Sequence, residues 1–241
     1  MALINILVLG AGELGTAVLT SLLQHPSRAH NKTSISLLLL LLLLLRFIAG
    51  PGTQLKIARA VLDAEAPFFI PWQVGVDYDT ICRRSAHDLF HEQLDVHDLL
   101  EAQKKKSWTA VLTEMFTSFL FDAGFGVVEF GGVDGKNAKV RALGSWENRV
   151  TVTAPEDIGK LTAENTFGDD GVVGGNAPVF IGGDTVRYAF VAELVKKITT
   201  KKVERSVLTT QALEKDHGNA LLKYDAIFGA GKGVAWDLEK T

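Results

Sequence analysis

Hydrophobic residues in the first half of the chain gather in short continuous runs, and amphipathic segments separate these runs. The runs, which predict buried strands, lie at residues 3–9, 68–70 and 108–113, and the patterns with a helical period lie at 13–24, 54–64 and 85–103. Strands that alternate with helices in this way predict a doubly wound parallel sheet with helices on both faces. The hydrophobic pattern therefore indicates the α/β fold class.

The run that should supply the second strand is unusual. Nine consecutive leucines, Leu37 to Leu45, follow Ser34-Ile35-Ser36 and precede Arg46. This run is too short to span a bilayer, which takes roughly 20 residues. A parallel strand that is covered on both faces does read as a continuous apolar run. A single strand of this length would nevertheless exceed the typical strand, so part of the run is expected to be loop or helix.

The pattern changes after residue 113, where short strands and glycine-rich turns replace the regular alternation. Strands are predicted at 127–130, 138–143, 150–153 and 179–181, and helices from 154 onward and from a Thr185 cap through 198. We therefore expect two domains. Residues 1–113 would form a reduced Rossmann-like core that binds the cofactor, and residues 114–241 a smaller α+β lobe, interleaved with the core, that binds the substrate.

Glycines at the end of the first strand give the clearest chemical signal. Gly10, Gly12 and Gly15 enclose Glu13 and Leu14 in a G-x-G-x-x-G pattern between a predicted strand and a predicted helix. In a dinucleotide-binding fold the first glycine allows a tight turn, the second lets the backbone approach a pyrophosphate, and the third lets helix and strand pack closely. The pyrophosphate then rests on the helix N-terminus. The alternative is an ordinary glycine-rich turn in an α/β protein.

Charge and cysteine content argue against several kinds of partner and bond. The 241-residue chain has a formal net charge of −3, which gives no electrostatic reason to expect nucleic acid or an anionic membrane as a partner. Cys82 is the only cysteine, so an intrachain disulfide is excluded. No basic and apolar leader precedes the first strand, which predicts a cytoplasmic protein.

The helix predicted over 85–103 carries two candidate features. Gln93 lies in the middle of its apolar stripe, where a buried amide needs a partner in the core or a ligand in a crevice. His87 and His91 have the i, i+4 spacing of zinc ligands, but the sequence places no third ligand beside them. We interpret the two histidines as part of a solvated face and predict no metal site.

Three segments together resemble a known family. They are Ile-Leu-Val-Leu-Gly-Ala-Gly-Glu-Leu-Gly at 6–15, Phe-Phe-Ile-Pro-Trp-Gln-Val-Gly-Val-Asp-Tyr-Asp at 68–79, and Thr-Val-Thr-Ala-Pro-Glu-Asp-Ile-Gly-Lys-Leu-Thr-Ala at 151–163. In this order they resemble the NmrA-like proteins, close to the isoflavone reductase-like group of atypical short-chain dehydrogenases. The resemblance covers nearly the whole chain except about residues 33–46. It implies a Rossmann core, NAD(P) binding and a smaller C-terminal substrate lobe.

Two departures from this family bear on function. The reductases use a lysine as catalytic acid/base, and the resemblance aligns Gln93 with it, which cannot titrate. The resemblance also implies that one or two β/α units are absent around residues 33–46, where the residue that selects the cofactor would lie. Positions 31–46 contain no Asp or Glu to bind the ribose of NAD, so NADP(H) is favoured over NAD(H), with Arg46 as the only candidate for its phosphate.

Two functions stay open at this point. The first is an NADPH-dependent oxidoreductase of a small carbonyl- or enone-type substrate, which is expected to contact Trp72, Gln73, Tyr78, Met115 and Phe116. The second is a non-catalytic regulator that senses the dinucleotide and binds a regulatory protein partner, or a decayed relative with weak cofactor binding. The missing proton donor favours the second, whereas the glycine pattern is common to both.

Overall fold

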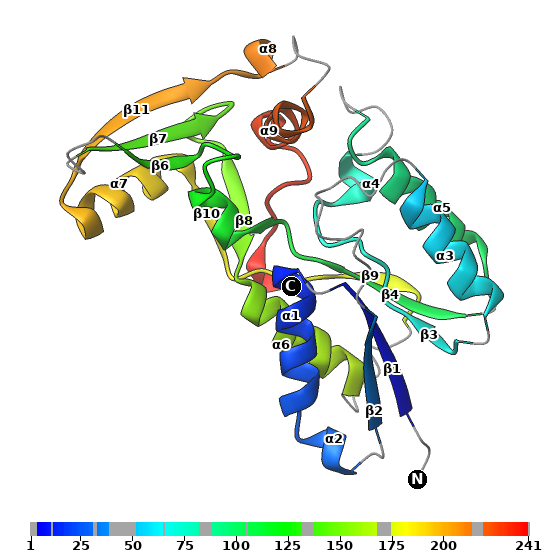
Figure 1. The fold of residues 1–241 in the computed structure, drawn as a ribbon. Coiled ribbons are helices and arrows are strands. Elements are labelled where there is room, and N and C mark those ends of the chain that lie inside the picture. The colour runs from blue at the N-terminus through cyan, green and yellow to red at the C-terminus, as the bar shows by residue number, and fades with distance from the viewer. Residues whose placement is uncertain are drawn as a thin grey trace. The chain divides into compact units, whose positions relative to one another are not determined.

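A computed structural model describes residues 4–10, 12–30, 33–38, 52–64, 66–81, 88–104, 106–131, 137–167, 175–213 and 219–240 (Figure 1). The chain divides into two compact units. Unit 1 comprises residues 1–73, 95–111 and 154–181, and unit 2 comprises residues 74–94, 112–153 and 182–241. The assignment of cofactor binding to 1–113 and of substrate binding to 114–241 stays a prediction.

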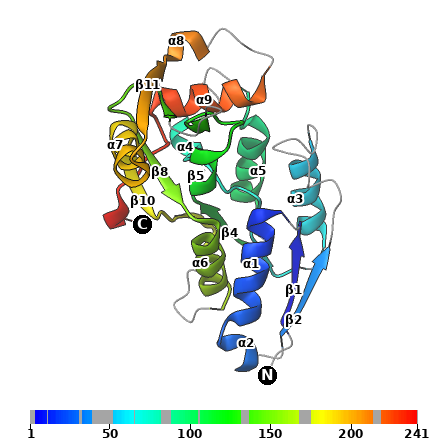
Figure 2. The same cartoon turned by 60° about the vertical axis from the view of Figure 1, so that its left-hand side comes forward.

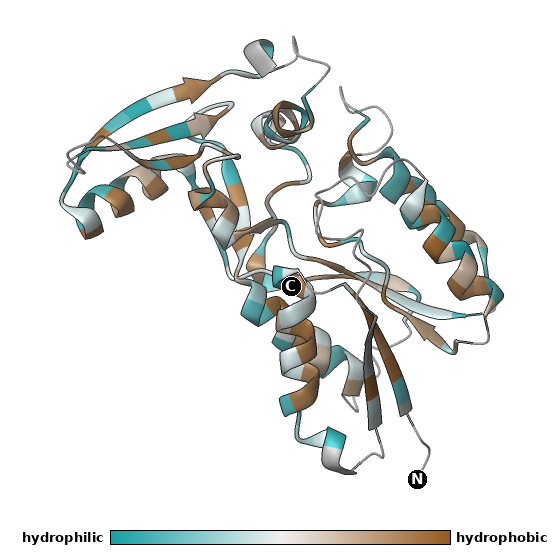
Figure 3. Ribbon diagram, viewed as in Figure 1, coloured by the Kyte–Doolittle hydropathy of each residue, from teal (hydrophilic) through white to brown (hydrophobic). Residues whose placement is uncertain are grey.

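Unit 1 begins with a strand, a helix and a second strand. β1 (Ile4–Leu9) and β2 (Thr33–Leu38) pair in parallel, with Ile6 opposite Ile35, and β1 is largely hydrophobic (Figure 3). α1 (Glu13–Gln24) and the short α2 (Ser27–His30) connect them. The predicted first strand and first helix are therefore confirmed. Most of the leucine run lies outside the described residues.

The core of this part of unit 1 lies between β1–β2 and two helices. α6 (Pro155–Phe167) runs alongside α1 in both views (Figures 1 and 2). Its side chains Ala163 and Phe167 form a buried cluster with Leu22 of α1, against which Ile6, Val8, Val18 and Ile35 pack. The helices approach so closely at Gly159 that a Cβ there would lie 2.5 Å from the carbonyl oxygen of Ala17. A glycine is therefore required where the two helices meet.

The opposite face of β1 is less well covered. Because successive side chains of a strand point to opposite faces, Leu7 points away from the core that holds Ile6 and Val8. The side chain of Leu7 is 60% exposed. Parallel strands in doubly wound folds are normally covered on both faces. The exposure of Leu7 is consistent with a region in which one or two β/α units of the family would be absent.

The remaining strands of unit 1 form a second hydrogen-bonded sheet. It has the order β3-β4-β9, from β3 (Phe68–Phe69), β4 (Ser107–Leu112) and β9 (Ala177–Phe180), and β3 and β4 are parallel. The helices α3 (Thr53–Asp63) and α5 (His91–Ala102) precede β3 and β4 in the chain. Within the described residues, β1 and β2 do not join this sheet, so the parallel strands form two separate hydrogen-bonded groups.

The described residues of unit 2 form two three-stranded sheets. The first has the order β10-β8-β5, from β5 (Met115–Phe116), β8 (Arg149–Thr153) and β10 (Asp184–Arg187), and the second has the order β11-β7-β6, from β6 (Val128–Gly131), β7 (Asn137–Leu143) and β11 (Lys202–Leu208). The helical segments are α4 (Tyr78–Ile81), η2 (Thr117–Phe121), α7 (Tyr188–Thr199), α8 (Thr210–Leu213), α9 (Ala220–Ala230) and η3 (Leu238–Lys240).

Helices α7 and α9 both pack on β7 of unit 2. The core beside α9 is aromatic. Tyr224 stacks on Phe228 with ring centroids 4.3 Å apart, and Phe119 stacks on Phe125 at the same separation. Tyr224 also meets Phe125 edge to face, at 4.9 Å. Phe125, Tyr224 and Phe228 are buried in this core, whereas Phe121 nearby in the chain is 47% exposed.

Two predicted elements are wrong at their boundaries. The helix expected over 85–103 begins only at His91, because the backbone of Asp88–Phe90 forms a turn closed by a hydrogen bond from the His91 N–H to the Asp88 carbonyl. Thr185 does not cap a helix. It belongs to β10, whose antiparallel pairing with β8 holds the backbone extended until α7 begins at Tyr188. No described helix is long and apolar enough to cross a membrane.

Candidate functional site

The turn between β1 and α1 has the geometry that its glycines require. Gly10 adopts a positive φ of 104°, which L side chains rarely accept. A Cβ at Gly15 would lie 2.2 Å from the carbonyl oxygen of Gly10, so only glycine allows this approach of helix to strand. A Cβ at Gly12, in contrast, would meet no atom within 4 Å. The first and third glycines thus serve the fold, whereas the second faces open space.

Helix α1 begins at this open space. Gly12 is its N-cap residue and supplies no side-chain hydrogen bond to the first turn, in which Glu13 is exposed and Leu14 is half-buried. The first N–H groups of a helix lack partners within the helix, and the helix dipole adds positive charge there. An anionic group approaching Gly12 would therefore meet backbone donors without steric hindrance. These residues fit the pyrophosphate of a dinucleotide.

Gln93 lies on α5 and is only 5% exposed. Val96 and Leu100 of the same helix are buried as well, so the predicted position of Gln93 within the apolar stripe is confirmed. Of the predicted histidine pair, His91 lies at the start of α5 and His87 lies outside the described residues. Arg46 also lies outside them. Across the described part of the chain, no group of three or more metal-ligating side chains forms.

The predicted substrate residues fall into both units. In unit 1, Trp72 is exposed, whereas Gln73 is buried. In unit 2, Tyr78 and Met115 are buried, and Phe116 packs on Phe119 with ring centroids 4.9 Å apart. Their role in substrate binding stays a prediction.

Sequence reasoning missed a buried carboxyl group in unit 2. Glu114, two residues after the end of β4, is 3% exposed and has a φ of 59°, in the left-handed region. Its N–H donates a hydrogen bond to the carbonyl oxygen of Gly75 at 2.9 Å. Among the described residues, neither oxygen of its carboxyl group has a hydrogen-bond partner. The available signal was a single acidic residue between Thr113 and Met115, in an otherwise apolar stretch.

The side chains that interact electrostatically with Glu114 are acidic groups, one carboxyl group and three phenols. Burial raises the pKa of the Glu114 carboxyl well above its usual range, and the nearby Asp77 carboxylate raises it further. Burial and the Glu114 charge likewise raise the pKa values of the phenols of Tyr78, Tyr188 and Tyr224. Burial thus favours the neutral forms of this carboxyl group and of these phenols in the interior of unit 2.

A second buried carboxyl group of unit 2 lies on α9. Burial raises the pKa of Asp225 to about 7, although the nearby Arg141 guanidinium opposes this shift. Arg141 also lies 3.4 Å from the carboxylate of Glu129, measured between Nη2 and Oε1. Asp225 therefore has a cation in its surroundings, and Glu114 has none among the groups that shift its pKa.

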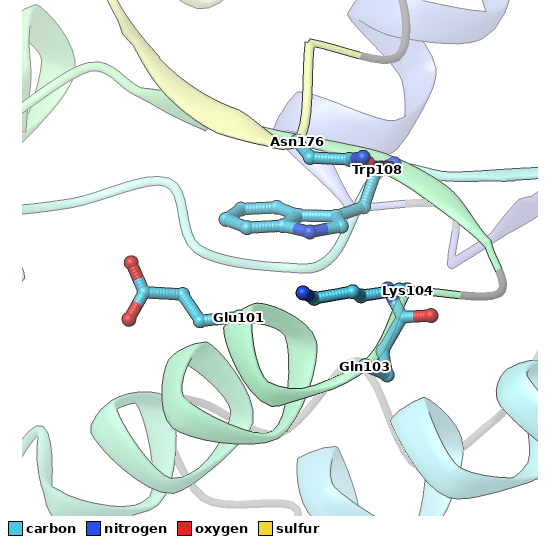
Figure 4. A pocket seen from close by; sticks show the side chains of 5 residues that line it. All are labelled: Glu101, Gln103, Lys104, Trp108 and Asn176. Carbon is cyan, nitrogen blue, oxygen red and sulfur yellow. Dashed lines mark hydrogen bonds between the residues drawn. The ribbon is translucent and has the colours of Figure 1, made fainter.

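The larger of two cavities described in unit 1, of about 590 Å³, is lined by Glu101, Gln103, Lys104, Trp108 and Asn176 (Figure 4). The indole of Trp108 forms one wall, and the Lys104 and Glu101 side chains face it from the end of α5. Trp108 lies at the amino end of β4, whereas open α/β sheets bind ligands beyond the carboxyl ends of their strands. This cavity is therefore not where the fold would hold a dinucleotide.

A groove of about 480 Å³ follows α1 and α6 in unit 1. His25 is among the residues that line it, and its imidazole stacks on Phe167 with centroids 4.9 Å apart and lies 3.2 Å from the Glu164 carboxylate. The groove extends to Glu13 and Thr16 in the first turn of α1. It therefore continues along the helix from the candidate pyrophosphate site.

Sequence identity to a curated relative shows the family of this chain. Over 284 aligned positions, covering 98% of this chain and 91% of the relative, the chain is 37% identical to an "NmrA-like family domain-containing oxidoreductase" of Gibberella moniliformis (strain M3125 / FGSC 7600). The chain belongs to the NmrA-like family. The aligned length exceeds the 241 residues of this NmrA-like protein, so the alignment includes gaps in it. No family model matches the chain.

Solved structures show that the fold of this NmrA-like protein is the Rossmann-like α/β fold of the isoflavone reductases. An isoflavone reductase has a TM-score of 0.66 at 17% identity, over 95% of this chain and 87% of the other. An NADPH-dependent quinone oxidoreductase of Escherichia coli, in complex with NADPH, has a TM-score of 0.67 at 17% identity, over 98% and 92% of the two chains. The predicted fold class and the resemblance to isoflavone reductases are confirmed.

Proposed function

We propose that this NmrA-like protein is an NADPH-dependent oxidoreductase that acts on a small organic carbonyl- or enone-type substrate. The observation that carries the proposal is the contrast between Gly15, which has no room for a side chain, and Gly12, which faces open space at an uncapped helix N-terminus. A turn built only for packing would not require an unobstructed Gly12. The name of the Gibberella relative supports the oxidoreductase class.

The choice of NADPH rests on two points. Positions 31–46 lack the acidic residue that would bind the ribose hydroxyls of NAD. The structurally similar quinone oxidoreductase was solved with NADPH. Arg46 is proposed to bind the additional phosphate of this cofactor.

Each group of residues in this chain has its own proposed role. Gly10, Gly12 and Gly15, with the N–H groups of Glu13 and Leu14, would hold the pyrophosphate, and NADPH would supply a hydride when bound. Gln93 would hydrogen-bond to the substrate or cofactor without titrating. The side chains proposed to contact the substrate are those of Trp72, Gln73, Tyr78, Met115 and Phe116.

Steady-state oxidation of NADPH in the presence of a panel of quinones, ketones and enones tests this proposal. We expect turnover with at least one compound class and slower turnover with NADH than with NADPH. Turnover that requires the protein and saturates with both substrates would support the proposal. NADPH binding without turnover for any compound would contradict it.

Gln93 favours a second candidate function, that of a regulator that binds the dinucleotide and a protein partner. Glutamine cannot deliver a proton as the lysine of the family's reductases does. In this case NADPH and NADP+ would bind with different affinities, and neither would be consumed. Calorimetric titration with both forms, combined with the turnover assay, distinguishes a sensor from an enzyme.

A further inference from the structure

Helix α7 of unit 2 carries hydrophobic side chains on two sides. One side packs on β7, and its buried residues are Tyr188, Val191, Ala192 and Val195. On the other side, Phe190, Leu194 and Ile198 are 47%, 41% and 71% exposed. Residues four apart are neighbours on a helix surface, so these three side chains form one continuous row, the α7 stripe. Contiguous exposed apolar side chains mark interaction sites, unlike single exposed ones.

Two opposite charges lie beside the α7 stripe. Glu193 directly precedes Leu194, and Lys197 directly precedes Ile198, so both charged side chains lie on the same flank of the stripe. Both are exposed. Within the described residues, neither side chain forms an ion pair. The stripe thus has one acidic and one basic group free for a partner.

The spacing of the stripe suits packing against another helix. Side chains at i, i+4 and i+8 form one of the ridges through which helices interdigitate, and the packing of two such ridges is the commonest class in globular proteins. With α7 of a second copy as the other helix, a two-fold axis at Leu194 would place Phe190 of one copy against Ile198 of the other. Leu194 would then meet its own equivalent at the centre.

The charges select the direction of this packing. Along the helix axis, Glu193 lies about 1.5 Å before Leu194 and Lys197 about 4.5 Å after it. In an antiparallel pair, Lys197 of the second copy would therefore lie within about 3 Å of Glu193 along the axis. A parallel pair would instead place like charges opposite each other, which is unfavourable. The stripe therefore complements an antiparallel copy of itself in spacing, hydrophobicity and charge.

We propose that the α7 stripe binds the α7 stripe of a second copy of this chain, antiparallel and about a two-fold axis at Leu194. The surface is self-complementary, as an isologous dimer requires. Its three side chains cover less than the roughly 800 Å² per partner of a standard interface, so the dimer is weak and reversible, with a Kd on the order of micromolar. This inference does not depend on the oxidoreductase function.

Sedimentation velocity of the full chain over about 1 to 100 µM tests the proposal. We expect the wild type to shift from monomer to dimer across this range. Leu194→Gln should raise the dimer Kd by about tenfold or more, because Leu194 lies at the centre of the interface. Leu221→Gln makes the matched change at another exposed leucine, on α9, and should leave the Kd unchanged. Equal melting temperatures of the two variants in dilute solution exclude misfolding as the cause.

Charge reversal tests the antiparallel pairing. Glu193→Lys and Lys197→Glu should each weaken the homodimer by about fivefold or more, because each variant places like charges across the interface. A mixture of these two variants, or one chain that carries both changes, should dimerise as well as the wild type. Lys196→Glu reverses a charge on the opposite side of the same helix and should have no effect.

Three results would overturn the proposal. A wild type that stays monomeric at the highest concentration would leave the stripe to a different protein. A dimer that Leu194→Gln does not weaken would use another surface. A mixture of Glu193→Lys and Lys197→Glu that forms no heterodimer would exclude the antiparallel arrangement about Leu194.

Discussion

A Cβ at position 15 would lie 2.2 Å from the carbonyl oxygen of Gly10, so α1 leaves β1 with no room for a side chain between them. Gly15→Ala should therefore lower the free energy of unfolding by about 1–3 kcal/mol, despite the better helix propensity of alanine. Urea unfolding measures this change. A variant as stable as the wild type would show that the turn opens easily and is not held by this contact.

Gly159 makes the corresponding contact between α6 and α1, where a Cβ would lie 2.5 Å from the carbonyl oxygen of Ala17. Gly159→Ala should push the helices apart and cost about 1–3 kcal/mol of stability. Glu156→Ala, at an exposed position of the same helix, is the matched control and should change stability by no more than about 0.5 kcal/mol. Equal effects in chemical denaturation would refute the close helix contact.

Truncating a side chain of α1 in the core that β1 covers should cost more stability than truncating one on the opposite face of β1. Leu22 is 2% exposed and lies in the core that one face of β1 covers. Leu22→Ala should therefore lower the free energy of unfolding by about 2–5 kcal/mol. Leu7 is 60% exposed on the other face, so Leu7→Ala should lower the free energy of unfolding by less than about 1 kcal/mol. Thermal unfolding of the two variants compares them. A large loss for Leu7→Ala would mean that its face of β1 is covered.

Asp225 should make stability depend on pH. Its pKa is raised from 3.8 to about 7 by burial, so the folded protein keeps a proton that the unfolded chain releases between these values. Below about pH 3.8 the group is protonated in both states and does not reduce the free energy of unfolding. This free energy then falls as pH rises from 3.8 to about 7. Asp225→Asn should therefore be more stable than the wild type above pH 7.

The expected gain of Asp225→Asn is up to about 4 kcal/mol, at 1.36 kcal/mol for each pKa unit. Arg141 limits it, because the variant removes one of the two carboxyl groups that interact with this cation, the other being that of Glu129. Denaturant midpoints of both proteins at pH 4 and pH 8 check the sign. A difference that is larger at pH 4 would contradict the raised pKa.

Local patterns predicted those parts of the fold in which neighbouring residues decide the structure. The apolar run at Ile4–Leu9, the glycines and the helix after them appear as expected. Gln93 is buried because the helical period alone puts it among apolar side chains. Pro155 likewise begins a helix, as its fixed φ favours.

Long-range contacts decided what the sequence did not predict. Thr185 looks like a helix cap until its pairing with Thr151 of β8 makes it part of a strand. Glu114 looks like an ordinary polar residue after a strand, whereas it is buried, and both Gly75, which accepts its backbone hydrogen bond, and the tyrosines whose pKa values it raises, Tyr188 and Tyr224, lie far from it in the chain. No periodicity within its own segment could indicate those neighbours.

Calorimetric titration of NADPH into the wild type and Gly12→Ala tests the central claim most directly. Gly12 has φ −73° and ψ −172°, which alanine adopts readily, and a Cβ there meets no protein atom within 4 Å. The account predicts that the wild type binds NADPH, and that Gly12→Ala melts at the same temperature but binds at least tenfold more weakly, by about 1.4 kcal/mol. Absence of binding to the wild type, or equal affinity in the two proteins, would contradict a dinucleotide site at this turn.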